Sequence, residues 1–209
     1  RGIDKQGKPK PNYDQGVDIH AKVSVLGEGT RGNLSKKLIN RHHLMKNKNP
    51  QVWAIGVKEL WQMPQDRVKP GYVAHTMGFP LGHNIFGGAF IYGMKNNILD
   101  IGLVMGLDYK DPSIDPHHEL QLLKTHPWIR SLLKDGKMIA YGAKSLPEGG
   151  YFSIPKLTVD GAMLIGDSAG FMNGQRLKGI HLAMKSGMEA AETILFALQQ
   201  DDFSDTTLS

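Results

Sequence analysis

Residues 161–198 contain the combination of residue types that is best suited to chemistry in this chain. Asp167 lies in a glycine-rich turn, Gly166-Asp167-Ser168-Ala169-Gly170, directly after a short apolar run from Ala162 to Ile165. A run of this length predicts one buried strand. A carboxylate at the carboxyl end of a strand accepts hydrogen bonds from the hydroxyl groups of a polyol. The turn therefore indicates a ligand-binding carboxylate, although a plain surface strand–helix unit explains the same pattern.

The segment after Gly179 has the spacing of a helix. Apolar or small residues recur on one face at Ile180, Met184, Gly187, Ala191, Ile194 and Leu198, which predicts a helix from about Gly179 to Leu198. The N-terminus of a helix carries about half a positive charge and free N–H groups. Such an end suits an anionic ring oxygen, and a reduced flavin is an anion of this kind.

A second strand–turn–helix signal lies near the start of the chain. A strand at Val23–Leu26 leads into Gly27-Glu28-Gly29-Thr30-Arg31-Gly32, and a helix is predicted from Leu34 to His43. The turn has the G-x-G-x-x-G spacing of dinucleotide-binding loops, but residues 46–57 lack the acidic residue expected about 20 positions later. The loop amides and Arg31 suit phosphate groups. A tight packing turn between strand and helix is the alternative.

The middle of the chain is rich in short strands and glycines. Strands are predicted at 51–61, in hairpins across 71–93, at 98–107 and through Ile154 and Leu157, with one helix at 116–124. We therefore predict an α/β (α+β) fold in which two nucleotide-binding βα pieces flank an inserted antiparallel sheet. Residues 1–45 and 156–209 form the nucleotide-binding domain and residues 46–155 form the insert. Residues 1–20 are predicted to be an extended loop.

Gly87 and Gly88 are the candidate ligand contacts of the insert. They lie between Phe86 and Phe90, where bare backbone amides beside aromatic rings suit a flat carbonyl ligand. A close crossing of two packed strands also requires glycines, and this alternative stays open.

Composition excludes several classes of function. The 209 residues include no cysteine, so they form no disulfide, no thiolate nucleophile and no cysteine-ligated cluster. The net charge is +5, but the lysines are scattered, which argues against a nucleic-acid partner. No apolar run reaches the roughly 18 residues of a membrane span. We predict no catalytic side chain and no metal ligand, because His117, His118 and His126 lack the spacing of a metal site.

The whole sequence resembles the electron transfer flavoprotein–ubiquinone oxidoreductase family. The likeness depends on long motifs in order, including VLGEGTRGNLSKKLI, GFPLG, FGGAFIYG, YGAKSLPEGGYFSIPKL and LIGDSAGFMNGQRLKGIHLAMKSGMEAAE. The FixC and geranylgeranyl reductase flavoproteins are more distantly similar. The resemblance implies an oxidoreductase with FAD and a [4Fe-4S] cluster, which passes electrons from reduced electron transfer flavoprotein to membrane quinone, either ubiquinone or menaquinone. It also implies a central fragment, since the family's ADP-binding segment and cluster cysteines fall outside these residues.

The resemblance assigns residues to two sites. The quinone-binding positions are Phe86, Gly87 and Gly88. Asp167 corresponds to the residue at the ribityl chain of FAD, and Gly179 to His181 correspond to the helix end at the flavin's pyrimidine edge. The FAD-binding positions together are Glu28, Gly29, Arg31, Gly32, Gly166, Asp167, Gly170, Phe171, Gly179, Ile180 and His181.

Three positions depart from the family pattern, and each departure removes a hydrogen-bonding group. Phe86 stands where the family has tyrosine, Phe152 where a side-chain amide is usual, and Ile180 where the family has threonine. These substitutions are expected to affect the redox potential of the flavin.

The quinone implies a peripheral place on the bacterial cytoplasmic membrane or the mitochondrial inner membrane. Contact through Phe79, Leu81 and Ile85 is expected. Two alternatives remain at this point. The chain is similar enough to FixC and geranylgeranyl reductases to use another electron acceptor, or it is a non-catalytic fragment that binds no FAD.

Overall fold

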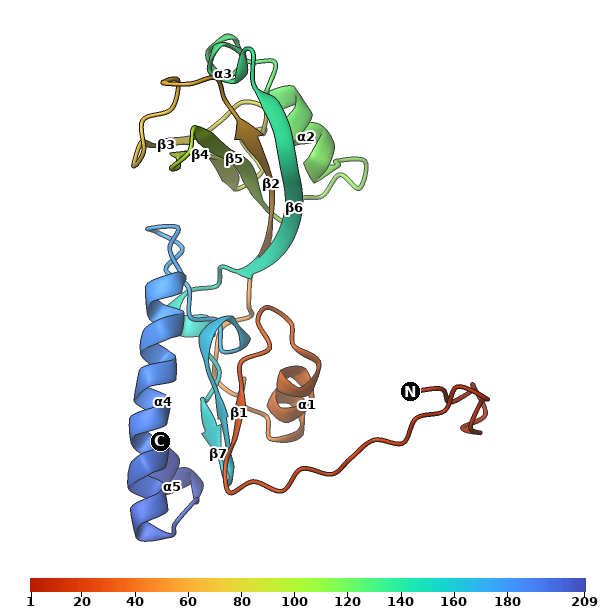
Figure 1. Cartoon of the computed structure of the whole chain (residues 1–209). Coiled ribbons are helices and arrows are strands. Elements are labelled where there is room, and N and C mark those ends of the chain that lie inside the picture. Colours follow the sequence, from red (N-terminus) through yellow and green to blue (C-terminus); the bar gives the residue numbers. More distant parts are fainter.

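The computed structural model describes all residues, 1–209, and shows two units stacked end to end (Figure 1). The upper unit is a five-stranded sheet with two short helices, and the lower unit is a three-stranded sheet between helices. Residues before the first strand run away from the lower unit as an extended segment (Figure 1), as the sequence predicts.

The upper unit is antiparallel throughout, which confirms the predicted antiparallel sheet. Its strands have the order β3-β4-β5-β2-β6. Their bounds are β2 Trp53–Gln62, β3 Val73–Thr76, β4 Gly87–Gly93, β5 Ile98–Gly106 and β6 Lys137–Pro147. The strand predicted at 98–107 is buried on both faces, because β5 lies at the centre of this sheet between β4 and β2.

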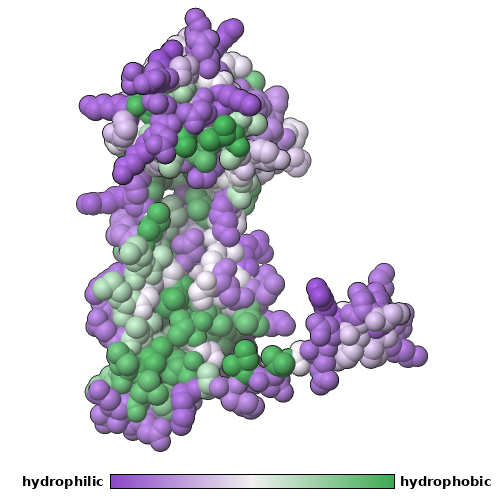
Figure 2. Space-filling model, in the orientation of Figure 1, coloured by the Kyte–Doolittle hydropathy of each residue, from purple (hydrophilic) through white to green (hydrophobic).

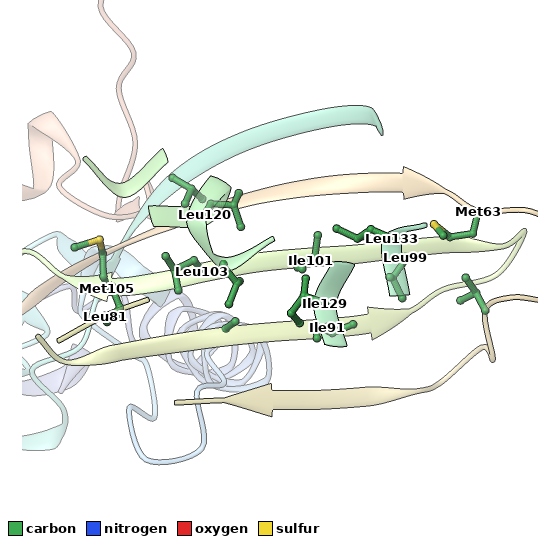
Figure 3. Close-up of a cluster of buried hydrophobic side chains, with 14 residues drawn as sticks. Met63, Leu81, Ile91, Leu99, Ile101, Leu103, Met105, Leu120, Ile129 and Leu133 are labelled. Carbon is green, nitrogen blue, oxygen red and sulfur yellow. The ribbon is translucent and has the colours of Figure 1, made fainter. Parts of the chain in front are cut away.

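Two helices close the core of the upper unit. They are α2, Pro116–Leu123, and α3, Pro127–Leu133, and each begins at a proline in its first turn. The Asp115 carboxylate caps α2 by accepting a hydrogen bond from the His117 N–H. The helices and strands enclose 14 buried apolar residues (Figure 3), among them Ile91, Ile101, Leu103, Leu120 and Ile129.

Leu81 corrects one prediction about the membrane. It is 7% exposed and belongs to the core of the upper unit (Figure 3), so it is not a surface contact. Its side chain lies against Gly87 of β4. Phe79, in the same loop, is 53% exposed and remains available to a membrane surface.

The lower unit contains both predicted strand–turn–helix pieces. Strand β1, Ser24–Leu26, pairs in parallel with β8, Ala162–Leu164, and β8 pairs antiparallel with β7, Thr158–Val159. Helix α1, Asn33–Arg41, and helix α4, Ile180–Gln200, lie on either side of this sheet (Figure 1). The chain ends with α5, Asp205–Leu208.

The buried face of α4 differs from the apolar stripe read from the sequence. Ala190 and Ala197 are the buried residues of this helix, and they pack with Met163 of β8. Ile180 and Met184, which belong to the predicted stripe, are 80% and 65% exposed. The spacing shows that the helix has an apolar face but not which of its residues β8 covers, so two alanines are buried and larger apolar residues are left exposed.

The strand predicted through Ile154 and Leu157 is wrong. Tyr151–Ser153 form a 3-10 turn, η1, and the sheet resumes only at β7. Pro155 has no N–H to donate to a neighbouring strand, which disfavours a ladder through this segment.

Apolar surface gathers over the lower unit (Figure 2). The exposed large apolar side chains of this unit include Met188, Leu195, Phe196 and Leu198 on α4 and Val17 and Ile19 in the extended segment. No helix of the structure has the length and hydropathy needed to cross a bilayer.

Candidate functional site

A cavity of about 890 Å³ lies where the upper sheet meets the lower unit. Strands β3 and β4 form its upper wall, and the first turn of α4 forms part of its lower wall. The turns after β1 and β8 and the loop before α4 complete it. Of the predicted site residues, the structure brings eight together here: Gly29, Phe86, Gly87, Gly88, Gly166, Asp167, Gly179 and Ile180.

The turn after β8 presents the Asp167 carboxylate to this cavity. Residues Gly166–Ser168 form a short 3-10 turn, η2, in which Gly166 has φ +56°, a conformation that favours glycine. The Gly166 N–H donates to Ser186 Oγ of α4 at 3.0 Å, which ties the turn to the helix. The carboxylate accepts one long hydrogen bond, from Thr30 Oγ1 to Oδ2 at 3.4 Å. It therefore retains acceptor capacity for a ligand.

The N-terminus of α4 lies beside that carboxylate. A Cβ atom added to Gly179 would lie 3.8 Å from Asp167 Oδ1. Gly179 is the N-cap residue of α4 and provides no side-chain cap, so no side chain occupies the N–H groups of the first turn. The Asp167 carboxylate therefore offers hydrogen-bond acceptors beside the N–H donors of α4. These donors lie at the positive end of the dipole of a 21-residue helix.

Gly87 and Gly88 line the upper wall with backbone. A Cβ atom on Gly88 would lie 2.1 Å from the Thr76 carbonyl oxygen of β3, and one on Gly87 would lie 2.3 Å from the Val104 carbonyl oxygen of β5. Close packing of neighbouring backbone therefore explains why both residues are glycine. The same packing places their peptide groups on the cavity wall, where a ligand could contact them.

A smaller cavity of about 270 Å³ lies on the other side of Asp167. Arg31, Gly32 and Gly170 line it, and Asp167 borders both cavities. The Arg31 guanidinium lies over the Trp53 ring at 5.6 Å from the ring centroid, which holds the cation at this wall. Such a cation suits the phosphate groups of a dinucleotide.

Glu28, Phe171 and His181 line neither cavity. The Glu28 carboxylate instead accepts hydrogen bonds at the N-terminus of α1, from the N–H of Leu34 and from the N–H and Oγ of Ser35. These bonds, the Ser35 N–H first, lower the pKa of Glu28. Phe171 packs against the core between the small sheet and α1, and His181 is exposed.

Two polar side chains that the sequence did not single out have unpartnered atoms at the larger cavity. Both carboxylate oxygens of Glu148 and the Thr76 hydroxyl are buried and lack a hydrogen-bond partner in the protein. Burial raises the pKa of Glu148. The sequence signal that could have pointed to Glu148 is a single charged residue between the end of a strand and two glycines, in Leu146-Pro147-Glu148-Gly149-Gly150. The donors and acceptors of this cavity suit a flat ring with carbonyl and N–H groups, and no cluster of side chains suits a metal ion.

The sequence is similar to known proteins over nearly its whole length. Residues 53–146 match the family model "ETF-QO, ubiquinone-binding". The chain is 46% identical to the human mitochondrial electron transfer flavoprotein-ubiquinone oxidoreductase over 99% of its own length and 34% of that protein. It is 44% identical to the probable Schizosaccharomyces pombe counterpart over 99% of this chain and 33% of that one. The chain thus spans about a third of the relatives it matches.

Solved structures share the fold at low sequence identity. A geranylgeranyl bacteriochlorophyll reductase-like protein from Thermoplasma acidophilum aligns with a TM-score of 0.68 and 18% identity over 91% of this chain and 45% of that one. The halogenase PltM, in a complex with phloroglucinol and FAD, aligns with a TM-score of 0.60 and 14% identity over 93% of this chain and 41% of that one. The fold is therefore one that occurs in flavin-dependent proteins.

Proposed function

We propose that this chain is the central part of an electron transfer flavoprotein–ubiquinone oxidoreductase. The complete enzyme passes electrons from reduced electron transfer flavoprotein through FAD to membrane quinone. One observation carries the proposal for the chain itself. A single cavity is lined by Asp167 and the uncapped end of α4 on one side and by the Gly87-Gly88 backbone of the matched ubiquinone-binding region on the other.

FAD fits the residues of the lower wall. The Asp167 carboxylate has the acceptor capacity for ribityl hydroxyls, and the first turn of α4 has donors for the pyrimidine edge. Arg31 in the smaller cavity would face the pyrophosphate. When bound, FAD supplies the chemistry of accepting and releasing electrons, and these residues orient it and set its potential.

The quinone fits the upper wall. Phe86, Gly87 and Gly88 provide a ring and bare peptide groups for a flat dicarbonyl headgroup. Met77 and Phe86, which line the cavity, are 86% and 56% exposed. Exposed apolar side chains at the cavity give an isoprenoid quinone a route from the bilayer, which supports a peripheral membrane location. The membrane would be the mitochondrial inner membrane or the bacterial cytoplasmic membrane. The quinone would be ubiquinone or menaquinone.

The proposal includes a [4Fe-4S] cluster in the complete protein. This chain has no cysteine, so the thiolate ligands of a cluster would come from residues outside it.

The alternatives have weaker support. A FixC or geranylgeranyl-reductase-like activity depends on likeness in fold, since the reductase-like neighbour is only 18% identical. A fragment that binds no FAD remains the alternative for the chain in isolation, because the ADP-binding segment of the family falls outside these residues. Absorbance of the purified chain after gel filtration separates this outcome from a flavoprotein.

Replacement of Asp167 tests the FAD site. Loss of a charge-assisted hydrogen bond costs about 1.5–3 kcal/mol, so Asp167→Ala in the complete protein should weaken FAD binding roughly 10- to 150-fold. Asp18→Ala, in the extended segment away from both cavities, is the matched control and should bind FAD within about twofold of the unmodified protein. Equal FAD affinity in both variants, measured by fluorescence titration of the apoprotein, would leave the turn with a packing role alone.

A further inference from the structure

Glu148 is the one acidic side chain of the larger cavity whose two oxygens are both unpartnered. It follows the last residue of β6, and its backbone N–H donates to the Val52 carbonyl at 2.7 Å. The next N–H, of Gly149, donates to Gln51 Oε1 at 2.6 Å. The backbone at Glu148 and Gly149 is therefore held against the two residues that precede β2, and Glu148 lines the cavity from this fixed backbone.

Glu59, one of the other buried carboxylates of the chain, shows what Glu148 lacks. Glu59 accepts hydrogen bonds from Trp61, Gln121 and Lys124. Glu148 accepts none. No lysine or arginine lines its cavity, where the other titratable groups are His75 of β3, Tyr92 of β4 and Asp167 of η2. Lys144 of β6 lies next to Gly29 on the adjoining turn. No cation offsets the burial of Glu148, so burial raises its pKa and favours the neutral acid.

The neutral form of a buried carboxylic acid has one proton to give, and this cavity is where the proposed reaction needs protons. Reduction of a quinone to a quinol takes two electrons and two protons. We propose that Glu148 is a proton donor to the quinone that binds in this cavity, an inference that rests on the function proposed above. The O–H bond of Glu148 breaks as a new O–H bond forms on one quinone oxygen. The two electrons would come from the FAD that Asp167 and the first turn of α4 would hold. Solvent water provides the second proton and then reprotonates the Glu148 carboxylate.

Replacement by glutamine tests the proposal in the complete, FAD-loaded protein. Glu148→Gln keeps the size of the side chain and removes its acidic proton. Glu192→Gln, an exposed position on α4, is the matched control. Three quantities are measured with a short-chain ubiquinone: its Kd, the rate of quinol formation against pH, and the infrared C=O band of a protonated carboxylic acid in the oxidised protein.

We expect Glu148→Gln to bind ubiquinone within about twofold of the unmodified protein and to form quinol roughly 100-fold more slowly, the usual size of a general-acid effect. The rate in the unmodified protein should fall as pH rises through the pKa of Glu148, and this fall should disappear in Glu148→Gln. The carboxylic acid band should be lost in Glu148→Gln alone. Glu148→Asp, which keeps the acidic proton, should recover part of the rate.

Opposite results overturn the inference. A normal rate and pH profile in Glu148→Gln would show that the proton comes from elsewhere, and a band that persists would show that Glu148 is ionised. If Glu148→Gln does not fold, Glu148→Asp decides, since a flat pH profile in that variant contradicts proton donation. Failure of the proposed function differs from failure of this inference. If the proposed function is wrong, the unmodified protein forms no quinol, but the carboxylic acid band can still be assigned to Glu148.

Discussion

The first residue of α4, Ile180, lies at the proposed flavin site. Ile180 lines the larger cavity and is 80% exposed within the chain, so a substitution there disturbs little packing. We expect Ile180→Thr to raise the midpoint potential, because a hydroxyl at the helix N-terminus favours a reduced, anionic ring. One hydrogen bond of about 0.5–1.5 kcal/mol corresponds to roughly 10–30 mV for two electrons.

Potentiometric titration of the complete protein measures this shift. Lys46→Ala changes an exposed side chain in the loop after α1 and should leave the potential unchanged. A lower or unchanged potential in Ile180→Thr would mean that this helix end does not face the flavin.

The raised pKa of Glu148 also predicts how the stability of the protein without ligand changes with pH. Because its pKa is raised in the folded state, the unfolded chain releases this proton first as pH rises above the ordinary value of 4.5. The stabilising effect of the neutral acid is complete below that pH and is lost as pH rises to the folded-state pKa. Glu148→Gln should therefore gain stability over the unmodified protein as pH rises, and match its pH dependence at lower pH.

Urea unfolding of the two proteins across a pH series measures the difference. A difference in the free energy of unfolding that stays constant with pH would show that Glu148 has an ordinary pKa.

At the scale of elements, one buried ion pair adds to the apolar contact of α2 with the sheet. Lys124, directly after α2, lies 2.8 Å from Glu59 Oε2 of β2, and their side chains are 18% and 4% exposed. Burial alone raises the pKa of Glu59, but hydrogen bonds from Lys124, Trp61 and Gln121 outweigh it, so the net pKa is lowered. The stabilisation is present above the ordinary pKa of 4.5 and is lost as pH falls through the lowered value.

Lys124→Met should destabilise the protein by about 3–5 kcal/mol at neutral pH, because it leaves the buried Glu59 carboxylate without its cation. The double variant Lys124→Met/Glu59→Gln removes that charge and should recover part of the loss. Equal losses in the single and double variants, measured by urea unfolding, would show that packing rather than charge is responsible.

The strands and helices differ in how well the sequence predicts them. The antiparallel insert was predictable because its alternating strands and glycine turns are local signals, and the parallel pair β1–β8 was indicated by two strand–turn–helix patterns. The buried face of α4 was not, because which residues β8 covers, here Ala190 and Ala197, is a property of the assembled fold. Glu148 was missed for a similar reason, since its lack of partners is a property of the assembled cavity.

At the scale of the whole molecule, the site depends on the junction of the two units. Neither unit encloses the larger cavity alone, because its walls come from β3 and β4 above and from η2 and α4 below. Single-residue changes test one wall at a time. A direct test must show that a quinone lies in the junction itself and must discriminate it from the apolar surface of the lower unit (Figure 2).

Photolabelling of the complete, FAD-loaded protein with an azido-ubiquinone makes that test, with the modified peptides identified by mass spectrometry. We predict that the label attaches to residues 75–92, which include the β3 and β4 wall, and that excess ubiquinone removes it. Label on the exposed side chains of α4, such as Met188 and Leu195, should persist under competition because it reports non-specific apolar contact. Competed labelling elsewhere, with none on residues 75–92, would contradict the assignment of this cavity to the quinone.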